Sequence, residues 1–351
     1  MATLTETTTP RHESLTGGQL PRWATSVLLA IAVALSLVLN VTTGLAGWFG
    51  TTLVVGLIFL LFQSTWSFRV EGRRHAVDRL ATTLVYTTFI AAIVPLVSVI
   101  FTVLVKGLAV ISWTFLTSSM RNISPRAEGG GVGHAVVGTL EQVGLAAMFA
   151  VPVGILAAIY LVEYGGGRLA RAISFFVDVM TGIPSIVAGL FIFTAFVLGL
   201  GLERSGFAAA LALAILMLPV IIRTTEEMLR IVSNELREAA YALGVPKWRT
   251  VLKVVLPTAL AGIVTGAMLA VARVAGETAP LLLTTFLTQS YNNNPFKGPQ
   301  SSLPLFIWDQ VTSGTTASVA RAWGGALVLI TIIMLFYITA KLLAARFAPK
   351  G

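Results

Sequence analysis

The sequence predicts an all-α integral membrane protein with eight transmembrane helices. Of its 351 residues, 56% are hydrophobic and 11% are charged, and the mean hydropathy is +0.87. Soluble domains average about 45–50% apolar and about 25% charged residues. The apolar residues also gather in runs of about 20, the length that a helix needs to cross a bilayer. We expect eight spans, at residues 24–43, 47–67, 80–105, 135–163, 172–200, 206–223, 258–286 and 322–343.

The distribution of basic residues predicts the orientation of these spans. If the N-terminus is inside, most of the 24 Lys and Arg residues fall in cytoplasmic segments, where membrane proteins carry their excess of positive charge. Both termini are therefore expected in the cytoplasm, with polar tails at residues 1–22 and 346–351. The first span is not a cleaved signal, because its apolar run is long and a second run follows almost at once. The net charge of +9 reflects these loops and does not indicate nucleic-acid binding.

Several kinds of site are excluded by composition. The chain has no Cys, which rules out disulfides, thiolate metal sites and Cys nucleophiles. His12, His75 and His134 are too far apart for metal-ligand spacing, so we expect no metal site. The sequence contains no Gly-Lys pair and hence no P-loop. We expect no cofactor on this chain, and any ATP and Mg²⁺ must be bound by another subunit.

The loop at 226–257 is the most charged stretch between two spans and has a helical pattern. Its first apolar stripe predicts a helix with one packed face, formed by Leu229, Val232, Leu236, Ala239 and Leu243. Gly244 has the backbone freedom that ends a helix, and Pro246 suits the first turn of the next. A second stripe is formed by Trp248, Val251, Leu252 and Val255. Pro257 marks the start of the following span, and one interpretation is an amphipathic hairpin on the inner leaflet.

The spacing within this loop carries a more specific resemblance. Glu238-Ala239-Ala240, then Gly244, Val254 and Leu256-Pro257, resemble the EAA loop of bacterial ABC-importer permeases, with Val254 where the family often has Ile. The resemblance implies that the loop couples the membrane domain to a nucleotide-binding subunit. It assigns this coupling to Glu238, Ala239, Ala240, Gly244, Leu256 and Pro257. Residues 80–345 then form the six-span core of a type I importer, and residues 23–79 are an extra two-helix hairpin with a basic loop.

Three further segments are similar to the phosphate-uptake branch of these permeases, the PstA type. They are DVMTGIPSIVAGL (178–190), LPVIIRTTEEML (218–229) and ARVAGETAPLLLT (272–284). The similarity implies a non-enzymatic permease subunit of an ATP-driven phosphate importer in a bacterial plasma (inner) membrane. Its implied partners are a PstC-like permease, two copies of a PstB-like ATPase, a PstS-like phosphate-binding protein and the lipid bilayer. The alternatives are another oxyanion, the PstC-type partner itself, or an ATP-independent secondary transporter or channel.

Ionisable residues inside apolar spans are costly and are therefore candidates for function. Arg273 and Glu277 are four residues apart, and Arg223 and Glu226 are three apart, so each pair is expected on one face of a helix. The arginines suit a phosphate pathway, because a guanidinium donates two parallel hydrogen bonds to phosphate oxygens. The glutamates would then neutralise the arginines when the pathway is empty. The alternative is that each pair is a salt bridge that fastens helices or closes a gate.

The fifth predicted span is interrupted by Thr181, Gly182, Pro184 and Ser185. Broken helices in transporters can present backbone N–H groups and hydroxyls to an anion, so this segment is a second candidate for the pathway. The alternative is a packing role, because Gly and Pro are common in transmembrane helices. Two further carboxylates, Glu141 and Asp178, lie within spans and are predicted to pair helices rather than to contact substrate.

Overall fold

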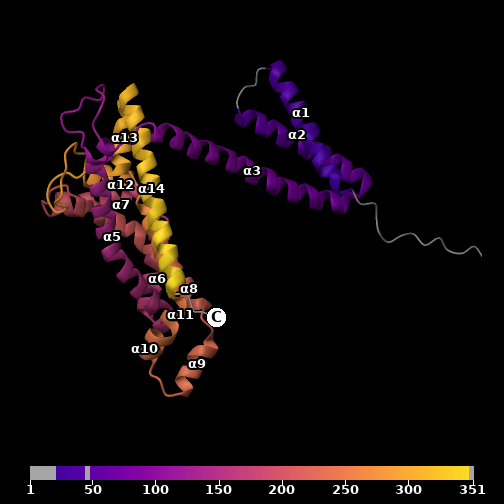
Figure 1. The fold of residues 1–351 in the computed structure, drawn as a ribbon. Helices are drawn as coiled ribbons and strands as arrows, with labels where there is room; N and C mark the ends of the chain where they lie inside the picture. The colour runs from indigo at the N-terminus through magenta and orange to yellow at the C-terminus, as the bar shows by residue number, and fades with distance from the viewer. Residues whose placement is uncertain (1–20, 44–47, 348–351) are drawn as a thin grey trace, which may run out of the picture. The chain divides into compact units, whose positions relative to one another are not determined.

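The computed structural model describes residues 21–43 and 48–347, and within these ranges the chain forms helices and irregular segments without a strand (Figure 1). The chain divides into two compact units, Met1–Thr102 and Val103–Gly351. The division falls inside α3 (Arg73–Leu108), which contributes residues to both. The tails predicted at 1–22 and 346–351 lie almost entirely outside the described ranges.

The first unit contains α1 (Arg22–Thr43), α2 (Trp48–Val70) and the first part of α3. Polar contacts join the first two helices: the Ser36 hydroxyl donates to the Thr51 carbonyl at 3.2 Å, and Asn40 Nδ2 donates to Thr51 Oγ1 at 3.1 Å. Helix α2 also comes close to α3 at Gly56, where an added Cβ would lie 2.6 Å from Thr87 Cγ2. Side-chain hydrogen bonds of this kind stabilise helix pairs where water is absent.

The prediction of eight spans is confirmed if one bent pair of helices is counted as a single span. Seven described helices are long and apolar enough to cross a membrane, and a further pair passes the same test together. The seven are Trp23–Thr42, Gly50–Val70, Arg73–Leu108, Gly133–Tyr164, Gly206–Ile231, Lys247–Val274 and Thr316–Arg346. The fifth predicted span is the bent pair, α6 (Arg168–Thr181) and α7 (Ser185–Ile192) with its π-helical continuation Phe193–Gly199.

The core of the second unit is built around α8 (Gly206–Ile231), which packs against α5 (Gly133–Ile159) and α11 (Leu256–Val274). Glycines permit the close approach: an added Cβ on Gly154 would lie 2.7 Å from Ile221, and one on Gly266 would lie 2.5 Å from Thr224 Oγ1. Small residues at helix contacts are typical of membrane proteins, because van der Waals packing replaces the hydrophobic effect there. Helix α14 (Thr316–Phe347) packs beside α11 and α13.

Two spans of this unit are interrupted, and the interrupted parts pack together. Helices α6 and α7 meet at an angle of 111° across the Gly182–Pro184 break. The seventh predicted span, 258–286, also fails to run through: α11 ends at Val274, and a short helix α12 (Ala279–Thr284) follows after a gap. Gly182 and Gly276 weaken the helix, and Pro184 and Pro280 lack the N–H that would continue it. An added Cβ on Gly189 of α7 would lie 2.5 Å from Pro280 Cα of α12, so the two segments are in direct contact.

One end of the second unit carries α9 (Asn234–Ala242) and α10 (Lys247–Thr250) (Figure 1). The first predicted helix of this loop is wrong in extent, because α8 ends at Ile231 and Val232 has an extended backbone. The second helix does not stop before Pro257. It continues through a π-helical turn, Val251–Val255, into α11, and such a turn accommodates a missing backbone donor. The opposite end carries α4 (Trp113–Thr117) and α13 (Leu303–Ser313).

Candidate functional site

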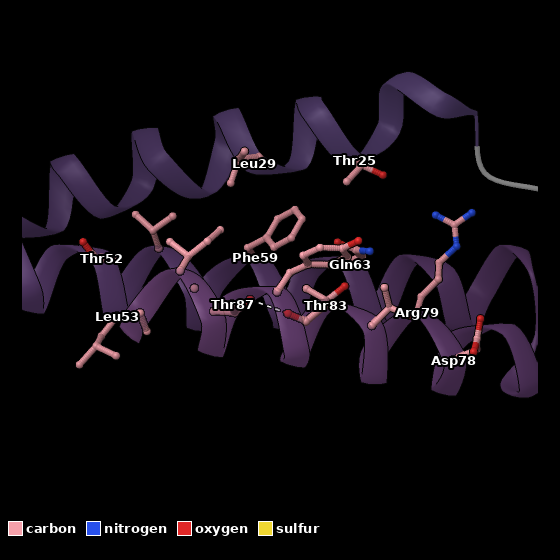
Figure 2. Close-up of a pocket in the computed structure, with 16 residues that line it drawn as sticks. Thr25, Leu29, Thr52, Leu53, Phe59, Gln63, Asp78, Arg79, Thr83 and Thr87 are labelled. Carbon is pink, nitrogen blue, oxygen red and sulfur yellow. Dashed lines mark hydrogen bonds between the residues drawn. The ribbon is translucent and has the colours of Figure 1, made fainter. Parts of the chain in front are cut away.

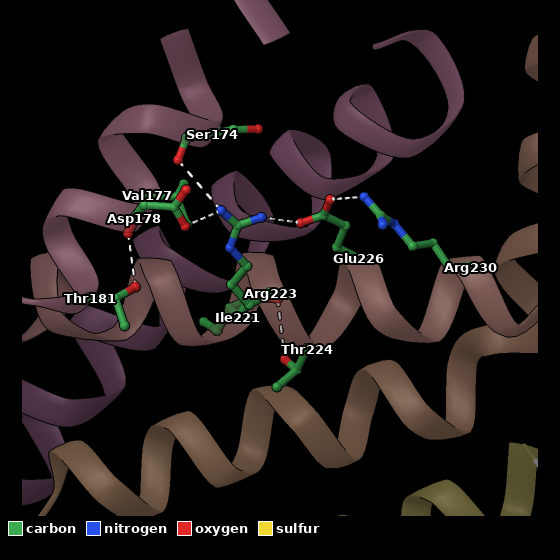
Figure 3. A network of polar contacts seen from close by, with 9 residues as sticks. All are labelled: Ser174, Val177, Asp178, Thr181, Ile221, Arg223, Thr224, Glu226 and Arg230. Atoms are coloured by element: carbon green, nitrogen blue, oxygen red, sulfur yellow. Dashed lines mark hydrogen bonds and ion pairs between the residues drawn. The ribbon is translucent and has the colours of Figure 1, made fainter. Parts of the chain in front are cut away.

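A four-residue ionic network links α6 and α8 (Figure 3). Arg223 Nη1 donates to Glu226 Oε2 at 2.7 Å, and Arg223 Nη2 donates to Asp178 Oδ1. Glu226 accepts a second bond from Arg230 Nη2 at 2.6 Å. Arg223 Nη2 also reaches the Ser174 carbonyl at 3.5 Å. The predicted contact between Arg223 and Glu226 on one helical face is confirmed, because α8 runs without interruption through both positions.

The network is electrically balanced, with two guanidinium and two carboxylate groups. Glu226 is its buried member, with 7% of its side chain exposed, whereas the Asp178 side chain is 69% exposed. Asp178 belongs to α6 and Arg223 to α8, so the predicted helix-pairing contact of Asp178 is present in the structure. Because two carboxylates hold Arg223, little of its positive potential remains for an anion in this conformation.

Arg273 and Glu277 are placed differently from the sequence expectation. They do not share a helical face, because α11 ends at Val274 and the Glu277 backbone lies beyond it. Arg273 is exposed in the last turn of α11, and Glu277 is half-buried. Neither side chain has a hydrogen bond or ion pair within the part of the chain that the structure describes. The physical reason is the Gly276 turn, which removes the spacing of four that a continuous helix imposes.

Thr181, Gly182, Pro184 and Ser185 lie at the bend between α6 and α7, as the sequence predicts. The Thr181 hydroxyl donates to the Val177 carbonyl at 2.8 Å and so remains within α6 (Figure 3). Ser185 is the first residue of α7, after Pro184 at its N-cap. The bend brings this segment near the second interruption through the contact of α7 with α12. The arrangement places two helix interruptions and Arg273 in one part of the fold.

The residues of the 226–257 loop separate into exposed and packed positions. Glu238 and Ala239 are exposed on α9, whereas Ala240 is buried against the chain itself, so Ala240 is not accessible to a partner in this conformation. Gly244 has φ +74°, the left-handed conformation that ends α9, and this prediction is confirmed. Large apolar side chains remain exposed around this turn, at Leu236, Tyr241, Leu243, Trp248 and Leu252.

Two further assignments of the loop are clear from the structure. Leu256 and Pro257 begin α11, and Leu256 packs against a cluster that includes Leu229 and Val255. They therefore join the exposed part of the loop to the core. The second predicted stripe is only half packed, because Val251 and Val255 are buried while Trp248 and Leu252 are exposed.

One contact of the loop, made by Arg237, was not predicted from the sequence. Arg237 Nη2 donates to Glu163 Oε1 at 2.8 Å and Nε donates to the same atom at 3.1 Å. The guanidinium also donates to the carbonyls of Leu229, at 2.9 Å, and Val232. It therefore caps the C-terminus of α8 and ties α9 to the π-helical turn Tyr160–Tyr164 that follows α5, where Glu163 has 4% of its side chain exposed. In the sequence, the contact could have been suspected only from Glu163, a carboxylate at the end of the span predicted at 135–163.

Glu141 makes its contact at the opposite end of the unit. It accepts a hydrogen bond from Gln300 Nε2, and Gln300 also receives a bond from Gln142 Nε2 at 3.1 Å. Thr285 Oγ1 donates to the Gln300 carbonyl at 2.8 Å. The prediction that Glu141 pairs two spans is therefore corrected: its partner lies in the segment before α13. The half-buried Glu141 carboxylate accepts from a donor beside it, here the buried amide of Gln300 that the loop inserts beside α5.

Comparisons with known proteins identify the family to which this chain belongs. Residues 150–350 match the family described as "Binding-protein-dependent transport system inner membrane component". The chain belongs to this family. It is 47% identical over 272 residues to "Phosphate transport system permease protein PstA 1" of Mycobacterium tuberculosis (strain CDC 1551 / Oshkosh), covering 77% of this chain and 90% of the relative. It is 46% identical over 281 residues to the PstA permease of Mycobacterium leprae (strain TN), covering 79% of this chain and 92% of the relative.

A solved structure supports the fold. The bacterial alginate ABC transporter, in complex with an alginate pentasaccharide-bound periplasmic protein, includes a chain that superposes with a TM-score of 0.55. The superposition covers 78% of this chain and 96% of the other, at 15% sequence identity. The superposition confirms the fold, whereas the family match and the PstA relatives confirm the resemblance to ABC-importer permeases.

Proposed function

We infer that this chain is the membrane-spanning permease subunit of an ATP-driven importer of inorganic phosphate. The observation that carries the inference is the identity of 47% with a phosphate transport permease over 77% of the chain. Two features of the structure support it: helix interruptions inside the membrane domain, and Arg273 beside them, which has no carboxylate partner within residues 21–43 and 48–347. The substrate is an oxyanion, for which guanidinium groups are the best-matched side chains.

The pathway assigned by this proposal runs along the interrupted spans. Arg273 offers its guanidinium to the phosphate, and the bend at Thr181, Gly182, Pro184 and Ser185 offers backbone N–H groups at the start of α7. Glu277 lies near Arg273 in sequence and limits how tightly the anion is held. Arg223 is neutralised by Asp178 and Glu226 in this conformation. It contributes to the pathway only when the contact between α6 and α8 opens.

The coupling element is the exposed surface of α9 and α10, including Glu238, Ala239 and the turn at Gly244. A PstB-like ATPase, with its ATP and Mg²⁺, binds this surface, and the exposed apolar side chains supply the contact area. Motion of α9 is transmitted to α8 and α5 through Arg237 and Glu163. A PstC-like permease and a PstS-like binding protein complete the importer. Both termini, with α9 and α10, face the cytoplasm of a bacterial inner membrane.

The test is phosphate uptake into proteoliposomes that contain this chain co-expressed with the permease, ATPase and binding-protein genes beside it. We expect uptake that requires ATP and stops when the ATPase subunit is omitted. Competition with sulfate and molybdate measures selectivity, and stronger inhibition by either than by phosphate would indicate another oxyanion. Uptake that persists without the ATPase would instead identify an ATP-independent transporter or channel.

A further inference from the structure

The first unit encloses a cavity of about 610 Å³, lined by residues of α1, α2 and α3 (Figure 2). Ligand sites in proteins span about 300–1,000 Å³, so the cavity has the size of a ligand site. All of its lining residues lie between positions 25 and 91, so none belongs to the interrupted spans or to the coupling loop. The proposed phosphate pathway therefore does not account for it.

Most of the cavity wall is apolar and follows the direction of the helices. Leu29, Leu53, Phe59 and Ile90 line it, and Ala91 marks its far end along α3. A helix rises about 1.5 Å per residue, so the stretch from Asp78 to Ala91 is about 20 Å long. One leaflet of hydrocarbon is about half of the bilayer's roughly 30 Å. The cavity thus has the length and the lining that one acyl chain requires.

Polar groups gather at the other end, and two of them lack partners. Gln63 of α2 is 7% exposed, and its Oε1 is buried without a hydrogen bond. Thr83 of α3 is also buried, and its hydroxyl has no hydrogen-bond partner within the described residues. Figure 2 shows Gln63, Thr83 and Arg79 toward the same end of the cavity. Buried polar groups are normally satisfied, so an orphaned amide in a cavity wall indicates a ligand with polar atoms at that depth.

The charges at the mouth of the cavity indicate which headgroup fits. Arg79 donates to Glu71 through Nε and Nη2, each at 2.7 Å, and the Ser67 hydroxyl donates to Glu71 at 2.7 Å. The charge of Arg79 is thereby balanced, although three of its five N–H donors remain for another acceptor. Asp78 is exposed and has no ion pair within the described residues. Among the residues that line the cavity, the unbalanced charge is therefore that of Asp78, which favours a cation in the headgroup; Arg69, Arg73 and Arg74 are close to Asp78 in the sequence but do not line the cavity.

We propose that this cavity binds a zwitterionic phospholipid whose headgroup carries a primary ammonium, as in ethanolamine lipids. The ammonium binds Asp78, and the phosphate accepts hydrogen bonds from the remaining Arg79 donors. The ester carbonyls of the glycerol region accept hydrogen bonds from the Thr83 hydroxyl and from the amide Nε2 of Gln63, and one acyl chain fills the apolar part between Phe59 and Ala91. The order of these residues along α3, charged, then polar, then apolar, is the order of the chemical groups in the lipid. A choline headgroup fits less well, because it has no N–H to donate.

The test uses the assembled transporter with the full chain, exchanged into vesicles of equal parts ethanolamine, choline and glycerol phospholipids. Native mass spectrometry then identifies the lipid that stays bound. We expect one ethanolamine lipid, retained at least about tenfold over the other two, because a charge-assisted hydrogen bond contributes about this factor. Asp78→Asn should abolish the preference, and Gln63→Leu should lower retention. Thr88→Val, at an exposed position of the same helix that does not line the cavity, is the control and should change neither.

A second pair of variants tests the position of the acyl chain. Ala91→Phe shortens the cavity and should shift binding toward lipids with shorter chains. Ala92→Phe, at an exposed position beside it that does not line the cavity, should leave the chain-length preference unchanged. The proposal is overturned if the anionic glycerol lipid is preferred, if the three headgroups are retained equally, or if no lipid is retained. It is also overturned if Asp78→Asn and Gln63→Leu both leave the preference intact in correctly assembled transporter.

Discussion

Arg223 and Arg273 lie on the packed helices α8 and α11, and each has a glutamate within four residues. Among the described residues, carboxylates hold Arg223 but not Arg273. Helix α8 continues past Glu226, which keeps that glutamate within reach, and α6 brings Asp178 to the other side of the guanidinium. Helix α11 ends one residue after Arg273, so Glu277 leaves the helical face. The difference separates a guanidinium that fastens two helices from one that is available to an anion.

Arg237 belongs with Arg223 in this comparison and is the more deeply held of the two. Its side chain is 12% exposed, against 34% for Arg223. It satisfies a buried carboxylate and two backbone carbonyls at once. The comparison therefore predicts that loss of Arg237 lowers stability and that loss of Arg273 lowers transport. Loss of Arg223 should lower stability, but by less than loss of Arg237.

The largest effect on stability is expected for Arg237→Met. The substitution leaves Glu163 buried without a cation, and breaking a buried pair in this way costs about 3–5 kcal/mol. The measurement is denaturant unfolding of the purified transporter. Arg230→Met is the matched control, since that side chain is 69% exposed and an exposed pair contributes about 0–1 kcal/mol. Equal losses of unfolding free energy in the two variants would show that the Arg237–Glu163 ion pair does not contribute more than an exposed pair.

The next largest effect is expected for Arg273→Gln, which should lower phosphate transport. Removing one charged hydrogen-bonding group from a bound anion costs about 1.5–3 kcal/mol, so phosphate uptake should fall about tenfold to a hundredfold. Arg273 has no partner among the described residues, so assembly and unfolding should be unchanged. Arg273→Lys keeps the charge without the planar fork and should retain part of the activity. Failure of Arg273→Gln to assemble would contradict a pathway role and favour a structural one.

A pair of double-mutant cycles sharpens the comparison further. Arg223→Gln and Asp178→Asn should be non-additive in the free energy of unfolding by about 1 kcal/mol, because the two side chains are in contact. Arg273→Gln and Glu277→Gln should be additive within about 0.5 kcal/mol, because they are not. Thermal unfolding of the four single and two double variants measures both couplings. A coupling at Arg273 equal to that at Arg223 would remove the distinction between the two sites.

The smallest effect is expected at the turn that ends α9. Gly244 has φ +74°, so Gly244→Ala should destabilise by about 1 kcal/mol through strain in the left-handed region. Gly144→Ala is the control: it lies inside α5, and an added Cβ would meet no heavy atom within 4 Å. Alanine there should stabilise slightly, since glycine costs about 0.5–1 kcal/mol in a helix. If the unfolding midpoints of both variants move in the same direction, the left-handed conformation at Gly244 does not explain the effect of Gly244→Ala.

Much of the fold could be predicted because it depends on local patterns. Apolar runs of bilayer length indicated the spans, and the spacing of Arg223 and Glu226 placed them on one face of α8. The turn at Gly244 also followed from the residue itself. The extents of the interrupted spans could not be predicted, because Pro is tolerated inside other helices of this chain. Pro95, Pro152 and Pro219 lie within α3, α5 and α8, where neighbouring helices and the bilayer maintain the helix.

The candidate site shows the same division between local and long-range information. By itself the sequence determined the membrane class, the helix–glycine–helix loop and the family, because these depend on composition and on spacings of a few residues. Only the tertiary structure decided that Asp178 completes the Arg223 network across 45 positions, and that Arg237 reaches Glu163 across 74. Helical periodicity determines which neighbours share a face, but not which two helices meet. That choice is made by the packing of small residues around α8, and it holds Arg223 while Arg273 has no partner among the residues that the structure describes.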